Sequence, residues 1–271
     1  MPRHIEDIDM GYDTLIVPTR TQRFHLEPSP RRVRADFGGA TIADSTHVLL
    51  LREVGRLPVY YFPWSDVLAG ALTPSEHSTV SELKGMATYY HVRLGERTAE
   101  NAAWSYEAPP PAGGPDLRGY VAFYWNAMDE WYEEDERAYA HARDPYKLID
   151  TRRGSRHVRI VLAGTTLAET RQPTLLFETG LPVRYYIPLE DVRMDVLEPS
   201  NTQSQCAYKG MASYWSARIG ERLYPDVAWY YREPLSLVAP ISGLIAFFQE
   251  RVDAIEVDGQ TVERPRTPWS S

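Results

Sequence analysis

One phrase occurs twice in the sequence, and this repetition constrains the fold more than any other feature. Residues 84–90 read Lys-Gly-Met-Ala-Thr-Tyr-Tyr, and residues 209–215 read Lys-Gly-Met-Ala-Ser-Tyr-Trp, 125 positions later. A chain of 271 residues has room for two domains that each bury a core. We therefore predict a duplicated globular domain, because a solenoid needs more copies. Further matches keep the same order: Val33 and Val158, Leu50 and Leu175, Glu53 and Glu178, Tyr61 and Tyr186, Trp104 and Trp229, Phe123 and Phe247.

Each copy consists of short segments rich in Val, Tyr, Trp, Thr and Ile, separated by Gly, Pro, Asp and Ser. This pattern is typical of antiparallel strands joined by turns. The fold class that it predicts is mainly β: two similar, small, twisted antiparallel β domains related by pseudo-twofold symmetry. The strands predicted for the first copy are 48–51, 59–62, 88–94, 103–106 and 120–124.

The repeat also predicts a plan for the chain. We expect an N-terminal arm over residues 1–30, because its charges, prolines and isolated apolar residues show no period. The first β domain then spans 31–124 and the second 151–260. A loose tail follows at 261–271, and a helical linker joins the domains at 125–150.

The predicted linker helix runs from Trp125 to about Arg143. Apolar residues recur within it at helical spacing, while the acids of residues 129–136 are expected to face water. An acidic face of this kind is usually only solvated, and the alternative is a docking surface for a partner protein. The apolar residues are Met128, Trp131, Tyr132 and Tyr139.

Composition narrows the classes of partner. The chain has 29 Lys and Arg against 37 Asp and Glu, a formal net charge of −8, which argues against binding to nucleic acid. Cys206 is the only cysteine, so an intramolecular disulfide and a cysteine-based zinc site are excluded. The N-terminus has no apolar run typical of a signal peptide, and no segment is apolar over the length of a membrane helix. We expect a cytoplasmic protein without a membrane partner.

The lysines of the repeated phrase, Lys84 and Lys209, are the first candidates for chemistry. A lysine beside a glycine at the mouth of an aromatic pocket could hold a carboxylate or phosphate, or act as a base or Schiff-base amine if it is desolvated. The alternative is a structural ion pair, with Asp66 or Glu96 as the expected partner. The sequence leaves both interpretations open.

Alternation along the strand after the phrase places a tyrosine and an arginine on one face in both copies. His91 shares this face but is replaced by Ser216, so a catalytic histidine is disfavoured. A Trp-x-Tyr pair on the next strand is expected either to line a pocket or to belong to the core. The predicted ligand-binding residues are Tyr89, Arg93, Trp104, Tyr214, Arg218 and Trp229, and the predicted proton donors are Tyr106 and Tyr231.

Motifs for nucleotides, nicotinamide cofactors and metals are missing from the sequence. It has no Walker loop, dinucleotide fingerprint, His-Glu-x-x-His or serine nucleophile elbow, and its histidines lack metal-ligand spacing. Cys206 precedes the second phrase without a nearby histidine, so a buried structural cysteine is favoured over a nucleophile. We predict a site without metal or cofactor.

Taken together, the motifs resemble the bacterial family known as domain of unknown function 427, in its two-domain form. They are Tyr-Phe-Pro-x-x-Asp-Val, Lys-Gly-x-Ala-x-Tyr, Trp-x-Tyr-x-x-Pro and Gly-x-x-Ala-Phe. The resemblance implies small β-tent-like domains related to methionine sulfoxide reductase B and to zinc-binding modules. Neither zinc nor the reductase chemistry carries over, because the Cys-x-x-Cys pairs and the catalytic cysteine motif are absent.

Three functions remain open at this point. The first is a cofactor-free enzyme that acts on a small molecule, anionic if Lys84 and Lys209 hold it. The second is a module that binds or senses a metabolite in the same pocket without changing it. The third is a fused homodimer that serves as an interaction scaffold, and a homo-oligomer is also compatible with the sequence.

Overall fold

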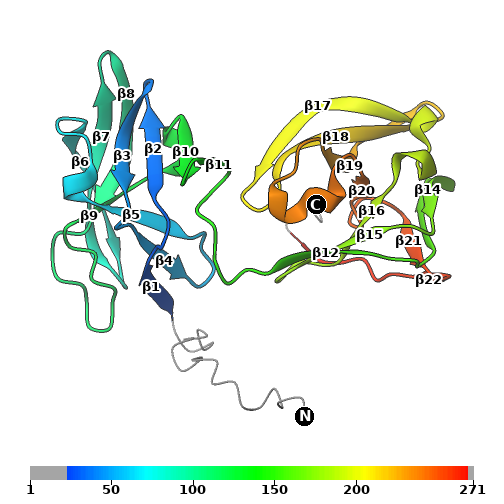
Figure 1. Ribbon diagram of the computed structural model, residues 1–271, viewed down its shortest axis with the longest axis horizontal. Helices are drawn as coiled ribbons and strands as arrows, with labels where there is room; N and C mark the ends of the chain where they lie inside the picture. Colours follow the sequence, from blue (N-terminus) through cyan, green and yellow to red (C-terminus); the bar gives the residue numbers. More distant parts are fainter. Residues whose placement is uncertain (1–22, 268–271) are drawn as a thin grey trace, which may run out of the picture. The chain divides into compact units, whose positions relative to one another are not determined.

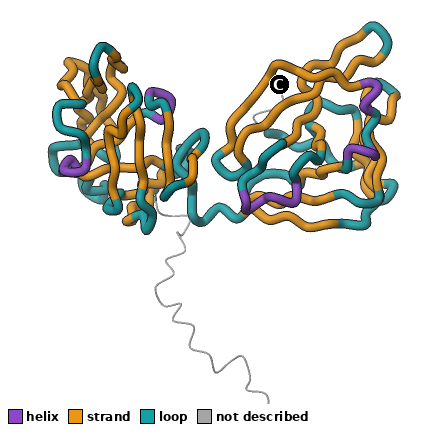
Figure 2. The backbone as a smooth tube through the Cα atoms, turned by 45° about the horizontal axis from the view of Figure 1, so that its top comes forward, coloured by secondary structure: helices purple, strands orange, loops and turns teal. Residues whose placement is uncertain are grey.

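The computed structural model describes residues 23–267, and each repeat in it is built from a seven-stranded and a four-stranded antiparallel sheet (Figure 1). Strands dominate both repeats, which confirms the mainly β class and the two similar antiparallel domains (Figure 2). The chain divides into compact units at Asp129 and Glu130, although strand pairing places β10 and β11 in a sheet with β2 of the first repeat.

In the first repeat the large sheet has the order β1 (Phe24–Pro28), β4 (Leu49–Glu53), β5 (Val59–Pro63), β9 (Tyr120–Phe123), β8 (Arg97–Ser105), β7 (Gly85–Leu94) and β6 (Leu72–Ser81). Its small sheet has the order β11 (Glu136–Ala138), β10 (Glu130–Glu133), β2 (Val33–Phe37) and β3 (Ala40–Ser45). Short 3-10 turns are η3 (Trp64–Asp66) and η4 (Trp125–Ala127).

The second repeat has the same plan. Its large sheet has the order β12 (Ile149–Arg153), β15 (Thr174–Glu178), β16 (Arg184–Ile187), β20 (Ile245–Phe247), β19 (Arg222–Tyr231), β18 (Gly210–Ile219) and β17 (Leu197–Cys206). Its small sheet has the order β14 (Thr165–Thr170), β13 (Val158–Leu162), β21 (Ala254–Val257) and β22 (Gln260–Thr261). The 3-10 turns are η5 (Leu189–Asp191), η6 (Met194–Val196) and η7 (Ser236–Ile241).

The large sheet is apolar on both faces, as the second repeat shows most clearly. One face packs on the small sheet, where Ile160 and Ile255 meet Ile187 and Phe247 in the main core. The opposite face, which we call the outer face, carries a second cluster that includes Tyr186, Trp229 and Tyr231. Because side chains alternate along a strand, neighbouring residues of β16 and β19 serve different clusters.

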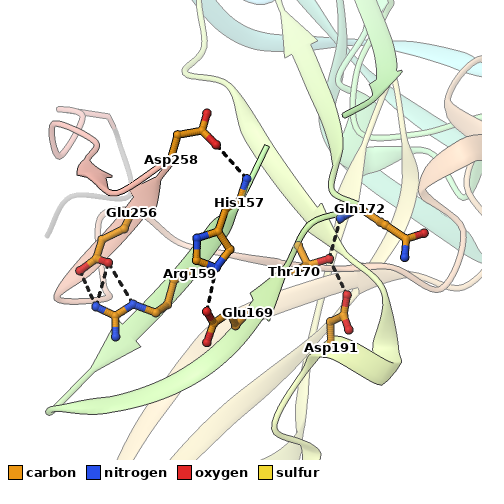
Figure 3. A network of polar contacts seen from close by, with 8 residues as sticks. All are labelled: His157, Arg159, Glu169, Thr170, Gln172, Asp191, Glu256 and Asp258. Carbon is orange, nitrogen blue, oxygen red and sulfur yellow. Dashed lines mark hydrogen bonds and ion pairs between the residues drawn. The ribbon is translucent and has the colours of Figure 1, made fainter. Parts of the chain in front are cut away.

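Polar contacts join the strands of the small sheet to one another and to the turn η5 (Figure 3). Arg159 on β13 pairs with Glu256 on β21 through two hydrogen bonds of 2.9 Å, and His157 Nε2 lies 2.7 Å from Glu169 on β14. Thr170 donates to Asp191 at 2.5 Å and accepts the Gln172 amide, as Ser45 does with Asp66 and His47 in the first repeat. The contacts of Thr170 are therefore part of the framework that both repeats share.

The predicted linker helix is wrong. Residues 125–143 contain the turn η4 and the hairpin of β10 and β11, in which Trp131 pairs with Ala138. Glu134 at the turn has a φ of 54°, and Asp258 occupies the same position of the second repeat with a φ of 53°. The acidic run is thus a hairpin and not a helix face, and Glu133 is buried.

The ends of the described chain are also more ordered in secondary structure than the sequence suggests. The predicted arm of residues 1–30 contains β1, which pairs with β4, while residues 1–22 lie outside the described range. The predicted loose tail pairs through β22, and Thr267 donates to Glu250 at 2.6 Å. Among the helices of residues 23–267, none has the length and apolar character required to cross a bilayer.

A bulge interrupts the pairing of β7 with β8 and of β18 with β19 at the same place. Asn101 and Asp226 adopt φ values of 51° and 50° there, a conformation that short polar side chains tolerate best. Their backbone amides donate to His91 Nδ1 at 3.2 Å and to Ser216 Oγ at 3.1 Å. His91 therefore acts as a local hydrogen-bond acceptor, a role that a serine performs equally well.

The glycines of the repeated phrase begin β7 and β18 with left-handed backbone. Gly85 has a φ of 86° and Gly210 a φ of 95°, and a Cβ at either position would meet nothing closer than 3.5 Å. The cost of a side chain is therefore conformational. We expect Gly85→Ala and Gly210→Ala each to lower the free energy of unfolding by about 1–2 kcal/mol in urea titrations.

The matched control for the glycine variants is Met86→Ala, because this next residue is exposed. It is expected to change the free energy of unfolding by less than about 0.5 kcal/mol. Glycine variants as stable as this control would contradict the conformational explanation.

Candidate functional site

The outer face of each repeat is organised around a tryptophan and a tyrosine that flank a small residue. Across the sheet, Trp104 on β8 lies opposite Ala122 on β9, which lies opposite Tyr61 on β5. Because Ala122 leaves room, Trp104 Nε1 donates to Tyr61 Oη at 3.3 Å. The second repeat reproduces this contact between Trp229 and Tyr186 at 3.1 Å, and the two rings are at 86° in both repeats.

Tyr89 extends the aromatic cluster of the first repeat. It lies opposite Trp104 on the neighbouring strand, and its hydroxyl lies 3.1 Å from Thr79 Oγ1. Tyr124 follows β9 and packs against both residues, with ring centres 4.6 Å from Trp104 and 6.4 Å from Tyr89. Burial and the adjacent Tyr89 raise the pKa of Tyr124 to about 12. Two predicted binding residues are thus brought together, and Tyr124 joins them.

The predicted lysines are paired within the fold. Lys84 Nζ contacts the carboxylate of Glu53, and Lys209 Nζ lies 2.5 Å from Glu178. The expected partners Asp66 and Glu96 are therefore not the ones used. Both lysines are largely buried, so their ammonium charges are neutralised by the repeated glutamate. Their role as ligand anchors stays a prediction.

Glu178 receives a further cation from the segment that precedes β12. Lys147 Nζ lies 2.8 Å from Glu178 Oε1, while Lys209 occupies Oε2. Burial alone would raise the pKa of this carboxyl group, but the charges and hydrogen bonds of the two lysines outweigh burial and hold the pKa below its usual value. Glu178 is consequently charged inside the fold.

The predicted proton donors are deeply placed tyrosines. Tyr106 lies with its ring centre 5.9 Å from Lys84 Nζ, and burial raises its pKa above the usual value of a phenol. Burial raises the pKa of Tyr231 as well. The raised pKa makes each phenol a weaker acid. Proton transfer is most efficient when the pKa of the donor lies near the working pH, so the shifts disfavour both tyrosines as proton donors. Their catalytic role remains a prediction.

The predicted arginines lie away from this cluster. Arg93 is four residues beyond Tyr89 on β7, a distance of about 13 Å along a strand. Arg218, at the same position of β18, forms an exposed ion pair with Glu198 at 2.5 Å and 3.0 Å. The alternation argument correctly grouped side chains by face, but it carried no information on distance along the strand.

A cavity of about 540 Å³ opens on the first repeat beside the Lys84 and Glu53 pair. Phe24, which lies opposite Glu53 in the pairing of β1 with β4, lines it together with Leu83, the residue before Lys84. Phe24 and Leu26 also pack against the cluster that contains Tyr61 and Tyr89. The remaining lining residues are Arg23, His25, Ala112 and Gly113.

The second repeat fills the equivalent space with its own side chains. Tyr208 replaces Leu83, is buried, and accepts the Asp144 amide at 2.9 Å. Val238 and Ile241 of η7 are also completely buried in the outer-face cluster. The outer face is therefore closed by the protein itself in this repeat.

A buried ion pair adds to this closure. Arg184 donates to Glu250 at 2.9 Å and 2.7 Å, with side chains 8% and 0% exposed, and its guanidinium lies 5.6 Å from the centre of the Trp229 ring. Arg251 lies 4.4 Å from the centre of Phe248. Phe248 is 6% exposed, whereas Tyr124 at the same position of the first repeat is 48% exposed.

Sequence reasoning missed Glu53, Tyr124, Arg184 and Glu250. The sequence aligns Glu53 with Glu178 but indicates no role for either residue. The signal for the others lies in the differences between the repeats, since Val59 and Asn126 stand where the second repeat has Arg184 and Glu250. A paired change from neutral to charged residues at equivalent positions indicates a new ion pair.

Neither a reactive cysteine nor a metal site is indicated among the described residues. Cys206 is a half-buried free thiol at the end of β17. Within residues 23–267, no three side chains of His, Cys, Asp or Glu come together in a way that could hold a metal ion. The expectation of a site without metal or cofactor stays a prediction.

Comparison with known proteins bears on the whole chain. A model of the family described as a domain of unknown function, DUF427, matches residues 25–134 and again residues 150–258. No curated protein matches the chain. The two matched segments coincide with the two sets of sheets and cover most of the sequence, as the repeated motifs predicted. The chain therefore belongs to the DUF427 family and carries two copies of its domain.

Proposed function

We propose that the protein binds a small organic molecule on the outer face of its first repeat and that the second repeat is a structural copy. The observation that carries this proposal is the difference between the equivalent faces. Tyr124 is exposed beside Trp104, and Phe24 and Leu26, which pack against the same cluster as Trp104, line a cavity of about 540 Å³. In the second repeat, Phe248 and Trp229 are buried beneath residues of the chain. A cavity of this size that adjoins a cluster of aromatic side chains is typical of ligand sites.

The electrostatics of the cluster favour binding over catalysis. The pKa values of the Tyr61, Tyr106 and Tyr124 phenols are raised, and the pKa of the Glu178 carboxyl group is lowered. Each pKa therefore moves away from neutral pH. Catalytic groups are usually shifted in the opposite sense. The scaffold hypothesis has less support, because the acidic run that motivated it forms a hairpin.

A fragment screen tests the proposal. Ligand-detected NMR with a library of ring-containing fragments is expected to yield binders of the full-length protein. Their signals should disappear in the variant Trp104→Leu with Tyr124→Ala, because stacking on these rings is lost. The control is Tyr146→Ala, an exposed tyrosine of the segment before β12.

Two results would contradict this assignment. Fragments that bind the double variant as well as the parent protein would place the site elsewhere. Conversion of a bound fragment over many turnovers would replace a binding module by an enzyme. Binders recovered unchanged after incubation support the proposal.

A further inference from the structure

We propose that the ligand of the first repeat is an organic cation, with an ammonium or guanidinium group that lies against Trp104 and Tyr124. This inference rests on the proposed function and names its ligand class. It follows from the way in which the second repeat occupies the same face. There, the chain places the cations Arg184 and Arg251 against the aromatic rings, and it places two lysines on the carboxylate of Glu178.

The second repeat supplies three cations that have no counterpart among the described residues of the first. Arg184 lies over Trp229, Arg251 lies over Phe248, and Lys147 reaches Glu178 Oε1. At the positions of the two arginines the first repeat has Val59 and Ala127. These side chains are neutral and much shorter, so they leave the ring faces accessible.

The groups that receive the cations are retained in the first repeat. Trp104 is equivalent to Trp229, Tyr124 to Phe248, and Glu53 to Glu178. Tyr and Trp attract cations through the negative faces of their rings. Glu53 pairs with Lys84 through Oε2, and its side chain is 13% exposed against 4% for Glu178, which also holds Lys147. The charge of Glu53 acts on Tyr61 and Tyr106 of the same outer-face cluster, so a carboxylate adjoins the cluster in which an ammonium or guanidinium group would bind.

Positive charge near the cavity defines the competing ligand class. Arg23 lines the cavity, but its side chain is 71% exposed and lies 3.9 Å from Glu82. Lys84 is neutralised by Glu53. Neither residue lies against the rings of Trp104 or Tyr124 in the way that Arg184 and Arg251 lie against those of the second repeat. An anion would have to bind near the exposed Arg23, at the rim of the cavity and away from the two rings. An anionic probe therefore tests the competing ligand class.

The test compares matched probes by isothermal titration calorimetry with the full-length protein. The cations are phenethylammonium and phenethylguanidinium, the anion is 3-phenylpropionate and the neutral analogue is 3-phenyl-1-propanol. We expect the cations to bind at least about tenfold more tightly than the anion, because the contact of a desolvated cation with aromatic rings stabilises a complex by at least that factor. The neutral analogue reports the contribution of the shared phenyl group.

Variants then transfer the internal cation between repeats. Val59→Arg with Asn126→Glu places the buried pair of the second repeat in the first and is expected to weaken cation binding at least about tenfold. Tyr124→Ala should do the same without adding a charge, and it keeps the test valid if the double variant does not fold. Glu198→Gln, an exposed change in the second repeat, is the control.

The outcomes separate the two proposals. If 3-phenylpropionate binds as tightly as the cations and depends on Tyr124, the cation inference fails while the binding site stands. If cation binding is unchanged in both variants, the inference also fails. If no probe binds, the cation inference fails, and the fragment screen decides separately whether the binding function fails with it.

Discussion

Replacing Glu250 by glutamine is expected to lower the free energy of unfolding of the second repeat by about 3–5 kcal/mol. The carboxylate is completely buried and receives two hydrogen bonds from Arg184. Without it, the guanidinium keeps its charge although its side chain is only 8% exposed. A buried charge without a partner costs far more than the intact pair contributes.

The matched comparison uses the residues of the first repeat. In Arg184→Val with Glu250→Asn both charges are removed, so the double variant should be more stable than Glu250→Gln alone. Amide hydrogen exchange of β16 and β20 measures the effect within the second repeat. Arg218→Ala, which breaks an exposed pair, should cost less than about 1 kcal/mol. A Glu250→Gln variant that exchanges like this control would show that the pair is not buried in solution.

The second large effect is expected at Lys84. Lys84→Met leaves Glu53 charged and mostly buried without its ammonium partner, and we expect a loss of about 3–5 kcal/mol in the free energy of unfolding. Lys209→Met should cost less, because Lys147 remains on Glu178. The double variant Lys84→Met with Glu53→Leu should recover much of the loss, since no buried charge is left.

Urea titrations of these variants, read by the exchange of β4 and β15 amides, separate the two repeats. Equal losses for Lys84→Met and Lys209→Met would contradict the role assigned to Lys147. The pH dependence has a defined sign for Glu178, whose pKa is lowered in the folded state. Its contribution is complete above the unfolded carboxyl pKa of about 4.3 and is lost as the pH falls through the lower folded value.

Much of the fold could be predicted because the sequence is repeated. Turn residues and β-branched or aromatic runs located β5 and β9 closely, and two aligned copies made chance patterns improbable. The helix prediction failed because Trp131 lies on β10 and Tyr139 directly follows β11 of the same hairpin, at a spacing that also fits a helix. Glu134 gives no turn signal, but Asp258 and Gly259 at the same turn of the second repeat do.

The candidate site was only partly predictable. Strand alternation placed Tyr89 and Arg93 on one face, because a period of two fixes the face of each residue. It carried no information that Trp104 lies opposite Tyr89 on the neighbouring strand. It could not find Glu53 as the partner of Lys84, since that contact joins two residues that are 31 positions apart in the chain. Long-range pairs of this kind depend on the order of strands in the sheet.

The bulge at Asn101 and Asp226 has a consequence for how the repeats diverge after duplication. What the structure preserves there is a hydrogen-bond acceptor for one backbone amide, supplied by a ring nitrogen of His91 or a hydroxyl of Ser216. The position therefore requires an atom that can accept a hydrogen bond and not a particular residue type. We therefore expect histidine, serine and similar acceptors to be interchangeable at this position without any gain or loss of chemistry.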